Sequence, residues 1–207
     1  MTDGVGMFVQ VINGRVIDAG AARAMGERWV SELGAEASGW LGSTAGVTAD
    51  GEFVVLARFS SAEEAQCNSE RPEQGAWWAE MEKLFVGEPS FADYDDVILV
   101  RGGGSDEAGF VQVMVGRTAD PDRERQLMQD FAEVGADFRP DILGGVVGIQ
   151  DDGTFAQAFY FTSEQEAREG EKLEPPAELR DAFDDESRLT SEIRFLDLTE
   201  PWIYTAR

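Results

Sequence analysis

Four residues in the N-terminal half, Asn13, Arg58, Trp77 and Trp78, have side chains that could hold a small organic molecule. An amide and a guanidinium can donate hydrogen bonds to a ligand oxygen, and indole rings can stack on a flat ligand. Each residue also has a structural interpretation, because Asn13 precedes a glycine as in a strand-end turn, and tryptophans commonly pack in a core. The set predicts a binding site and leaves the catalytic residues unassigned.

The residue types that are missing exclude several kinds of chemistry. The 207 residues include no histidine and a single cysteine, Cys67. The commonest general base and the commonest metal ligand are therefore absent, and one cysteine can form neither an internal disulfide nor a cysteine metal cluster. Without a histidine beside it, Cys67 is not expected to act as a catalytic thiolate. We expect a protein that uses no metal and no cofactor.

The charge of the chain restricts its partners. It has 17 basic and 41 acidic residues, which gives a formal net charge of −24 at pH 7. Such a surface repels nucleic acid and anionic lipid, so neither is expected as a partner. The sequence has no signal-peptide pattern and no apolar run of membrane-spanning length, and we expect a cytoplasmic protein.

The sequence repeats itself with an offset of 102 residues. Phe8–Asp18 (FVQVINGRVID) matches Phe110–Asp120 (FVQVMVGRTAD), and 18 of the 58 positions from Phe8–Ala65 are identical in Phe110–Ala167. The glycine-rich segment RGGGSDEAG separates the two copies and is typical of a flexible linker. The sequence therefore predicts a first repeat at 1–100, a linker at 101–109 and a second repeat at 110–207.

Each repeat contains local signals for the element order β-α-β-β-α-β. In the first copy, an apolar strand at Phe8–Arg15 is followed by a helix N-cap at Asp18 and an Asp-Gly hairpin turn at residues 50–51. A capping box, Ser61 with Glu64, and a last strand at residues 90–100 complete the copy. The second copy repeats them, with its last strand near residues 191–204. This order predicts an α+β protein made of two ferredoxin-like repeats.

The sequence resembles the dimeric α/β-barrel superfamily, and within it antibiotic-biosynthesis-monooxygenase-like domains in tandem. The resemblance rests on the element order and on the segments ARFSSAEEAQCNSE and WWAEMEKLF. It implies that the repeats pack as an intramolecular barrel, so that the chain is a monomer or dimerises through another surface. It also implies binding of a small apolar or aromatic molecule, with oxidation by a cofactor-free monooxygenase mechanism as one activity of the superfamily. The alternative function is a non-catalytic ligand-binding or scaffold protein.

The resemblance also assigns roles to particular residues. Haem-degrading members use an asparagine on the first strand, a tryptophan in the second helical region and an iron-ligating histidine; Asn13 and Trp77 or Trp78 could match the first two, but nothing matches the histidine. In a cofactor-free monooxygenase, Asn13, Arg58, Trp77 and Trp78 would bind the substrate. Their counterparts at the repeat offset are Val115, Tyr160, Leu179 and Arg180. We therefore expect the ligand in the first half, with the second half mainly completing the barrel.

Overall fold

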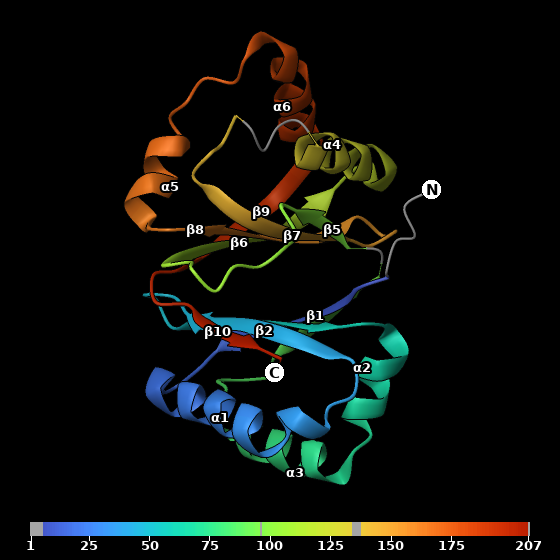
Figure 1. Ribbon diagram of the computed structural model, residues 1–207, viewed down its shortest axis with the longest axis vertical. Coiled ribbons are helices and arrows are strands. Elements are labelled where there is room, and N and C mark those ends of the chain that lie inside the picture. The colour runs from blue at the N-terminus through green and yellow to red at the C-terminus, as the bar shows by residue number, and fades with distance from the viewer. Residues whose placement is uncertain (1–5, 96, 134–137, 207) are drawn as a thin grey trace. The chain divides into compact units, whose positions relative to one another are not determined.

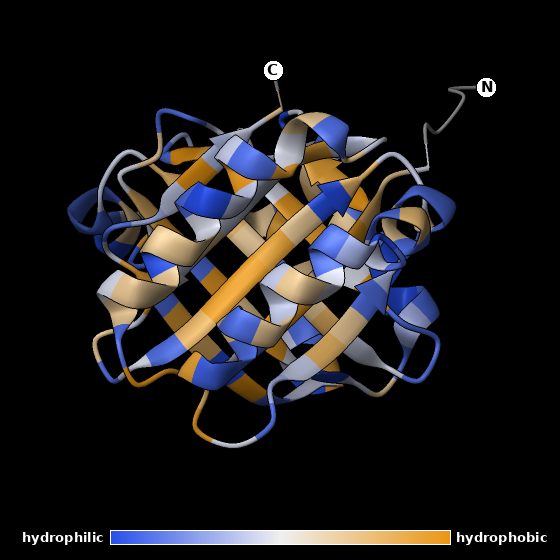
Figure 2. Cartoon of the chain, turned by 90° about the horizontal axis from the view of Figure 1, so that it is seen from below, coloured by the Kyte–Doolittle hydropathy of each residue, from blue (hydrophilic) through white to orange (hydrophobic). Residues whose placement is uncertain are grey.

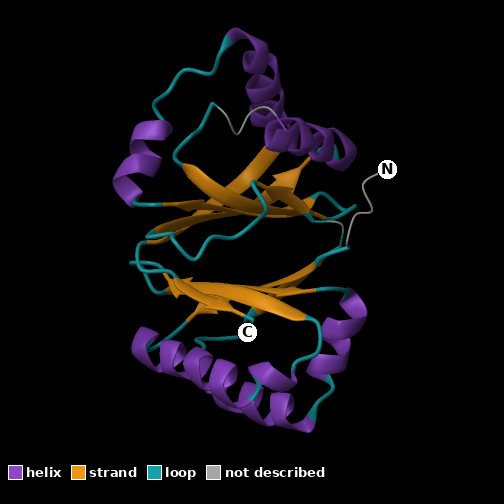
Figure 3. Cartoon of the chain, in the orientation of Figure 1, coloured by secondary structure: helices purple, strands orange, loops and turns teal. Residues whose placement is uncertain are grey.

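The computed structural model describes residues 6–95, 97–133 and 138–206. The chain divides into two compact units, one formed by Met1–Asp96 with Pro201–Arg207 and the other by Val97–Glu200. Each unit is an α+β structure with one five-stranded antiparallel sheet and helices on one face of that sheet (Figure 1 and Figure 3). The predicted α+β class and the ferredoxin-like order of elements are confirmed.

The first unit has the strand order β10-β2-β3-β1-β4. Its elements are β1 (Phe8–Arg15), α1 (Ala19–Glu32), the short 3-10 helix η1 (Gly34–Glu36), β2 (Trp40–Val47), β3 (Glu52–Phe59), α2 (Ala62–Ser69), α3 (Pro72–Met81), the 3-10 helix η2 (Glu82–Leu84), β4 (Ser90–Tyr94) and β10 (Trp202–Thr205).

The second unit has the equivalent strand order β5-β7-β8-β6-β9. Its elements are β5 (Ile98–Val100), β6 (Phe110–Thr118), α4 (Pro121–Glu133), β7 (Ile142–Ile149), β8 (Thr154–Phe161), α5 (Glu164–Gly170), α6 (Ala177–Leu189) and β9 (Thr190–Leu198). Among the described residues, no helix has the length and apolar character needed to span a membrane.

The local signals in the sequence act as expected. The side chain of Asp18 accepts a hydrogen bond from the Ala21 amide at 2.9 Å and caps α1. Ser61 and Ser163 cap α2 and α5 in the same way. The hairpin glycines Gly51 and Gly153 have φ angles of 89° and 88°, which a side chain would disfavour. These contacts are local, so each repeat forms its own helix starts and turns.

The last strand of each repeat differs from the expectation. The segments predicted as single strands, 90–100 and 191–204, each contain two strands that join different sheets. β4 pairs with β1 in the first unit, whereas β5 pairs with β7 in the second; β9 and β10 mirror this exchange. Each sheet therefore has five strands where four were expected, because the exchanged strand hydrogen-bonds the otherwise open edge of β2 or β7.

This exchange changes how the chain divides. The structural units separate after Asp96 and after Glu200. The sequence repeats were predicted at 1–100 and 110–207, and that division of the sequence stays a prediction. The segment 101–109, expected to be a flexible linker, begins with a defined turn. The Gly103 amide donates to the Val100 carbonyl at 3.0 Å, and the Arg101 guanidinium donates to the Ile142 carbonyl at 2.7 Å.

The register of the central strands decides which side chains face the helices. In the first sheet Gln10 pairs with Ala57 and Ile12 with Val55. In the second, Gln112 pairs with Phe159 and Met114 with Gln157. Alternate residues of a strand point to opposite faces, so these pairs share one face and their neighbours point to the other. The apolar bands along the strands, with mixed helix surfaces over them, are visible in Figure 2.

Candidate functional site

A cavity of about 320 Å³ lies between the sheet and the helices of the first unit. All five tryptophans of the chain line it: Trp29, Trp40, Trp77, Trp78 and Trp202. They come from α1, β2, α3 and β10, elements that are far apart in the sequence. The fold therefore collects the largest aromatic side chains of the protein around one internal space.

Contacts between the rings hold this aromatic lining in place. Trp29 and Trp40 pack edge to face, with ring centroids 4.9 Å apart and an interplanar angle of 70°. Trp78 packs against Phe91 in a similar way at 5.3 Å, and against Trp77 at 6.1 Å. Edge-to-face and offset arrangements are the favourable geometries for aromatic pairs. The cavity wall is therefore built in advance of any ligand.

Hydrogen bonds orient three of the indoles. Nε1 of Trp29 donates to Oε1 of Gln74 at 2.5 Å, and Nε1 of Trp40 donates to Oγ of Ser43 at 3.0 Å. Nε1 of Trp77 donates to the Met25 carbonyl at 2.9 Å. Because their N–H groups are already bonded to the protein, these indoles offer a ligand mainly their apolar surface.

Tyr204, on β10, is the polar group of the cavity that the sequence reasoning missed. Its hydroxyl oxygen is buried and has no hydrogen-bond partner in the structure. Burial, with a smaller contribution from the negative charge of Glu27, raises the pKa of Tyr204 to about 12. The phenol is therefore neutral at physiological pH, and a buried unsatisfied O–H group is available to a ligand.

The cavity is otherwise neutral. The described side chains that line it include no aspartate, glutamate, lysine or arginine. Its remaining polar members are amides and hydroxyls: Gln10, Ser43, Asn68, Ser69 and Gln74. A charged ligand would find no counter-ion here, and a ligand proton would find no strong base.

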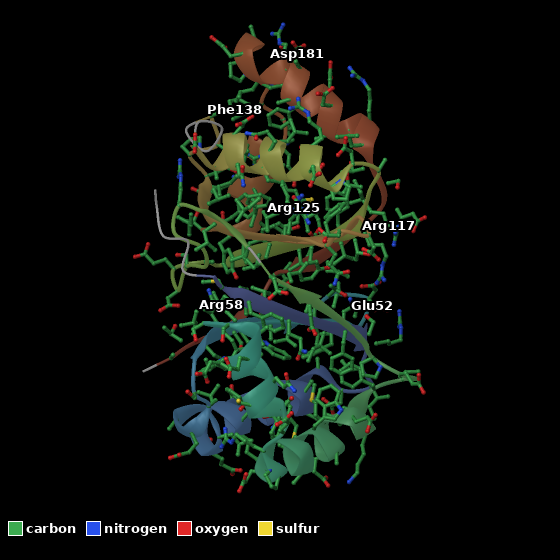
Figure 4. All side chains as sticks on the ribbon, turned by 90° about the vertical axis from the view of Figure 1, so that its right-hand side faces the viewer. Glu52, Arg58, Arg117, Arg125, Phe138 and Asp181 are labelled. Atoms are coloured by element: carbon green, nitrogen blue, oxygen red, sulfur yellow. The ribbon has the colours of Figure 1, made fainter. Side chains whose placement is uncertain are left out.

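Of the four residues singled out in the sequence, the structure brings two into this cavity. Trp77 and Trp78 line it, whereas Asn13 and Arg58 are not among its lining residues. Oδ1 of Asn13 accepts a hydrogen bond from the Ser90 hydroxyl at 2.9 Å. Arg58 lies on β3 (Figure 4), and its Nε atom is buried without a hydrogen bond.

The strand phase explains this separation. On β1, Asn13 is out of phase with the cavity residues Gln10 and Ile12, which share the opposite face of the strand. On β3, Arg58 is likewise out of phase with the cavity residue Ala57. Their side chains therefore belong to the face of the sheet that points away from the helices. The period-two alternation around Ile12 was the sequence signal that could have distinguished the two faces.

The second unit has a cavity of its own, of about 560 Å³, again between sheet and helices. Leu179 and Phe183 of α6 supply apolar walls to it, so the first unit is not alone in having an apolar cavity. The expectation that the ligand lies in the first half stays a prediction. No tryptophan lines the cavity of the second unit, since all five lie in the first unit.

The described residues contain no group of three or more histidine, cysteine, aspartate or glutamate side chains arranged to hold a metal ion. Cys67 is exposed on α2 and is not part of either cavity lining.

Comparison with solved structures finds the same fold across both units. The chain is 11% identical to a protein named "Putative monooxygenase" from Fusobacterium nucleatum, covering 96% of this chain and 94% of that one with a TM-score of 0.73. A "putative monooxygenase" from Lactobacillus acidophilus is 10% identical over 97% and 96% of the two chains, with a TM-score of 0.70. An "anthrone oxidase-like protein" is 14% identical over 98% and 91%, with a TM-score of 0.63.

These likenesses show that the chain shares the fold of these proteins. No protein-family model matches the sequence. A comparison with curated proteins likewise finds no match.

Proposed function

We propose that the first unit binds a small, neutral aromatic molecule in its tryptophan-lined cavity. The observation that carries the proposal is the convergence of all five tryptophans on one internal space. Ligand sites are typically concave and apolar with a few well-placed polar groups, and this cavity has that character. Its volume of about 320 Å³ is at the small end for such sites, which favours a compact ring system.

Tyr204 supplies the group that orients the ligand. Its buried O–H has no partner in the protein and can donate to a carbonyl or phenol oxygen of the bound molecule. The neutral lining excludes strongly ionised ligands, because burying an unpaired charge is costly. An uncharged aromatic with one oxygen substituent therefore matches both the walls and the unpartnered Tyr204 hydroxyl.

The proposal extends to oxidation of the bound molecule, which the names of the structurally similar proteins favour. In such a reaction dioxygen converts an electron-rich phenol to a quinone, with one oxygen atom entering the ring and the other leaving as water. The lining residues include no carboxylate or lysine to take the phenol proton. The substrate would therefore bind as the neutral phenol, and binding and the exclusion of water would be the contribution of the protein.

Titration of the purified protein with 1-naphthol, followed by calorimetry and by tryptophan fluorescence, tests the binding proposal. We expect saturable one-site binding with quenching, because every tryptophan lines the cavity. The anion 1-naphthalenesulfonate, which has the same ring system, should bind much more weakly. If neither naphthol nor uncharged phenols of similar size bind, or if the anion binds equally well, the proposal is wrong.

An oxygen electrode tests the oxidation step separately. Consumption of dioxygen in the presence of an easily oxidised hydroxynaphthalene, and its loss in Trp78→Ala, would support a monooxygenase. Binding without oxygen consumption across a panel of electron-rich phenols would instead support a non-catalytic ligand-binding protein.

A further inference from the structure

The cavity of the second unit has apolar walls of a different kind. Leu127, Met128 and Phe131 of α4 face Phe159 of β8 and Phe183 of α6 across it. Phe131 packs edge to face against Phe159 at 5.9 Å and against Phe183 at 6.5 Å. With about 560 Å³ of space, this cavity can accept a larger or longer apolar group than the tryptophan-lined one.

The two arginines in its lining are already paired with acids. Nη2 of Arg139 lies 2.7 Å from Oδ2 of Asp141, and these side chains are 15% and 11% exposed. Nη1 of Arg168 lies 2.9 Å from Oε1 of Glu171, and its other amino group bonds Asp197. An anionic ligand would have to compete with these ion pairs, so the arginines do not form a ready anion site.

Two carboxyl groups between α4 and α6 have no such partner. Glu186 lines the cavity and is half-buried, and no basic side chain among the described residues pairs with its carboxyl group. Glu124, on α4, is 0% exposed, and neither of its oxygens has a hydrogen-bond partner. Burial raises the pKa of Glu124 to about 7, and the charge of Glu186 adds to that rise. Neither carboxyl group is therefore paired with a cation among the described residues, and one of the two, Glu186, lines the cavity.

A buried amide points to the same space. Gln157 of β8 is 2% exposed and lines the cavity, and no described group hydrogen-bonds its side chain. Buried side-chain amides normally have at least one partner, so an unbonded one beside an empty volume indicates a missing hydrogen-bonding group. Its counterpart in the first repeat is Val55, whose apolar side chain needs no hydrogen-bond partner.

We propose that the cavity of the second unit binds an apolar amine, with Glu186 as the counter-ion of its ammonium group and the Gln157 amide oxygen as a further acceptor. An ammonium group is a hydrogen-bond donor only, so it suits a site whose free groups are a carboxyl and an amide oxygen. The phenylalanine, leucine and methionine side chains receive the hydrocarbon part. This site is distinct from the tryptophan-lined cavity and does not depend on the function proposed for it.

Calorimetry with three matched probes tests this proposal. 4-Phenylbutylamine, 4-phenylbutanol and 4-phenylbutyrate share one hydrocarbon and differ in the charge of the end group. At pH 8 we expect the amine to bind at least about tenfold more tightly than the alcohol, because a hydrogen bond to a charged group is worth more than a neutral one. Equal affinity for the amine and the alcohol, or preference for the carboxylate, would overturn the assignment.

Variants locate the site. Glu186→Gln should lose the preference for the amine, whereas Asp184→Asn removes the same charge from an exposed position of the same helix and should leave it unchanged. Gln157→Leu should weaken amine binding more than alcohol binding. Trp78→Ala, in the other cavity, should have no effect, so that failure of the first proposal does not affect this one. Full amine preference in folded Glu186→Gln, checked by circular dichroism, would contradict the proposed counter-ion.

Discussion

The two cavities occupy equivalent places in equivalent sheets and have different linings. Gln10 and Gln112 stand at the same repeat position, and each amide donates to an aspartate on the neighbouring edge strand, Asp93 at 2.9 Å and Asp197 at 3.2 Å. Around this shared framework, Trp77 of the first unit corresponds to Leu179 of the second. The backbone of the repeat therefore specifies where a cavity forms, and the side chains specify what it can bind.

The clearest difference lies on the first helix of each repeat. Ala22 of α1 and Glu124 of α4 are equivalent at the repeat offset, and both are buried. One position holds a methyl group, and the other holds a carboxyl group without a partner. A buried unpaired acid destabilises the folded state when it ionises, and among the described residues such an acid is found in the second unit.

The largest expected effect is a loss of ligand affinity in the first cavity. Trp78→Ala should weaken binding of 1-naphthol about tenfold to a hundredfold, because it removes a wall that packs against Trp77, Phe85 and Phe91. Calorimetry measures the change. Asn13→Ala, on the other face of the sheet, is the matched control and should bind normally; equal losses in both variants would show that the cavity is not the site.

A second prediction concerns the pH dependence of stability. The folded pKa of Glu124, about 7, is above its ordinary value of 4.5, so the folded state binds this proton more tightly than the unfolded state. The acid therefore lowers the free energy of unfolding progressively as pH rises from about 4.5 to above 7. Glu124→Gln should remove this loss and raise that free energy by about 2 to 3 kcal/mol at pH 8.

Urea denaturation at pH 5 and pH 8 measures the effect. The gain from Glu124→Gln should be much smaller at pH 5, where the folded wild type is already protonated at this position. Asp184→Asn, on the exposed side of α6, should show little change at either pH. A gain that is the same at both pH values would show that ionisation of Glu124 is not its cause.

The smallest expected effect concerns a single hydroxyl group. Tyr204→Phe should reduce the affinity for 1-naphthol about fivefold to tenfold, in line with the loss of one neutral hydrogen bond. The affinity for naphthalene, which has no oxygen, should not change. Calorimetry with both probes makes the comparison, and an equal loss for both would mean that Tyr204 contributes packing alone.

The sequence alone was sufficient for the features that depend on neighbouring residues. The repeat, the strand–helix–hairpin order, the Asp18 and Ser61 caps and the Gly51 turn all follow from contacts within a few positions along the chain. Trp77 and Trp78, which the sequence singled out, both line the cavity of the first unit, and their part in ligand binding stays a prediction.

The tertiary structure decided which residues line the first cavity and which acid is buried in the second unit. Trp202 and Tyr204 line the first cavity because their strand, β10, pairs with β2. The two strands are far apart in the sequence, and no local pattern predicts that they pair. Glu124 is one of 41 acidic residues, and only the packing of α4 against α6 and the sheet removes it from water. Local elements depend on short-range hydrogen bonds, whereas burial and desolvation depend on which distant segments come to lie together.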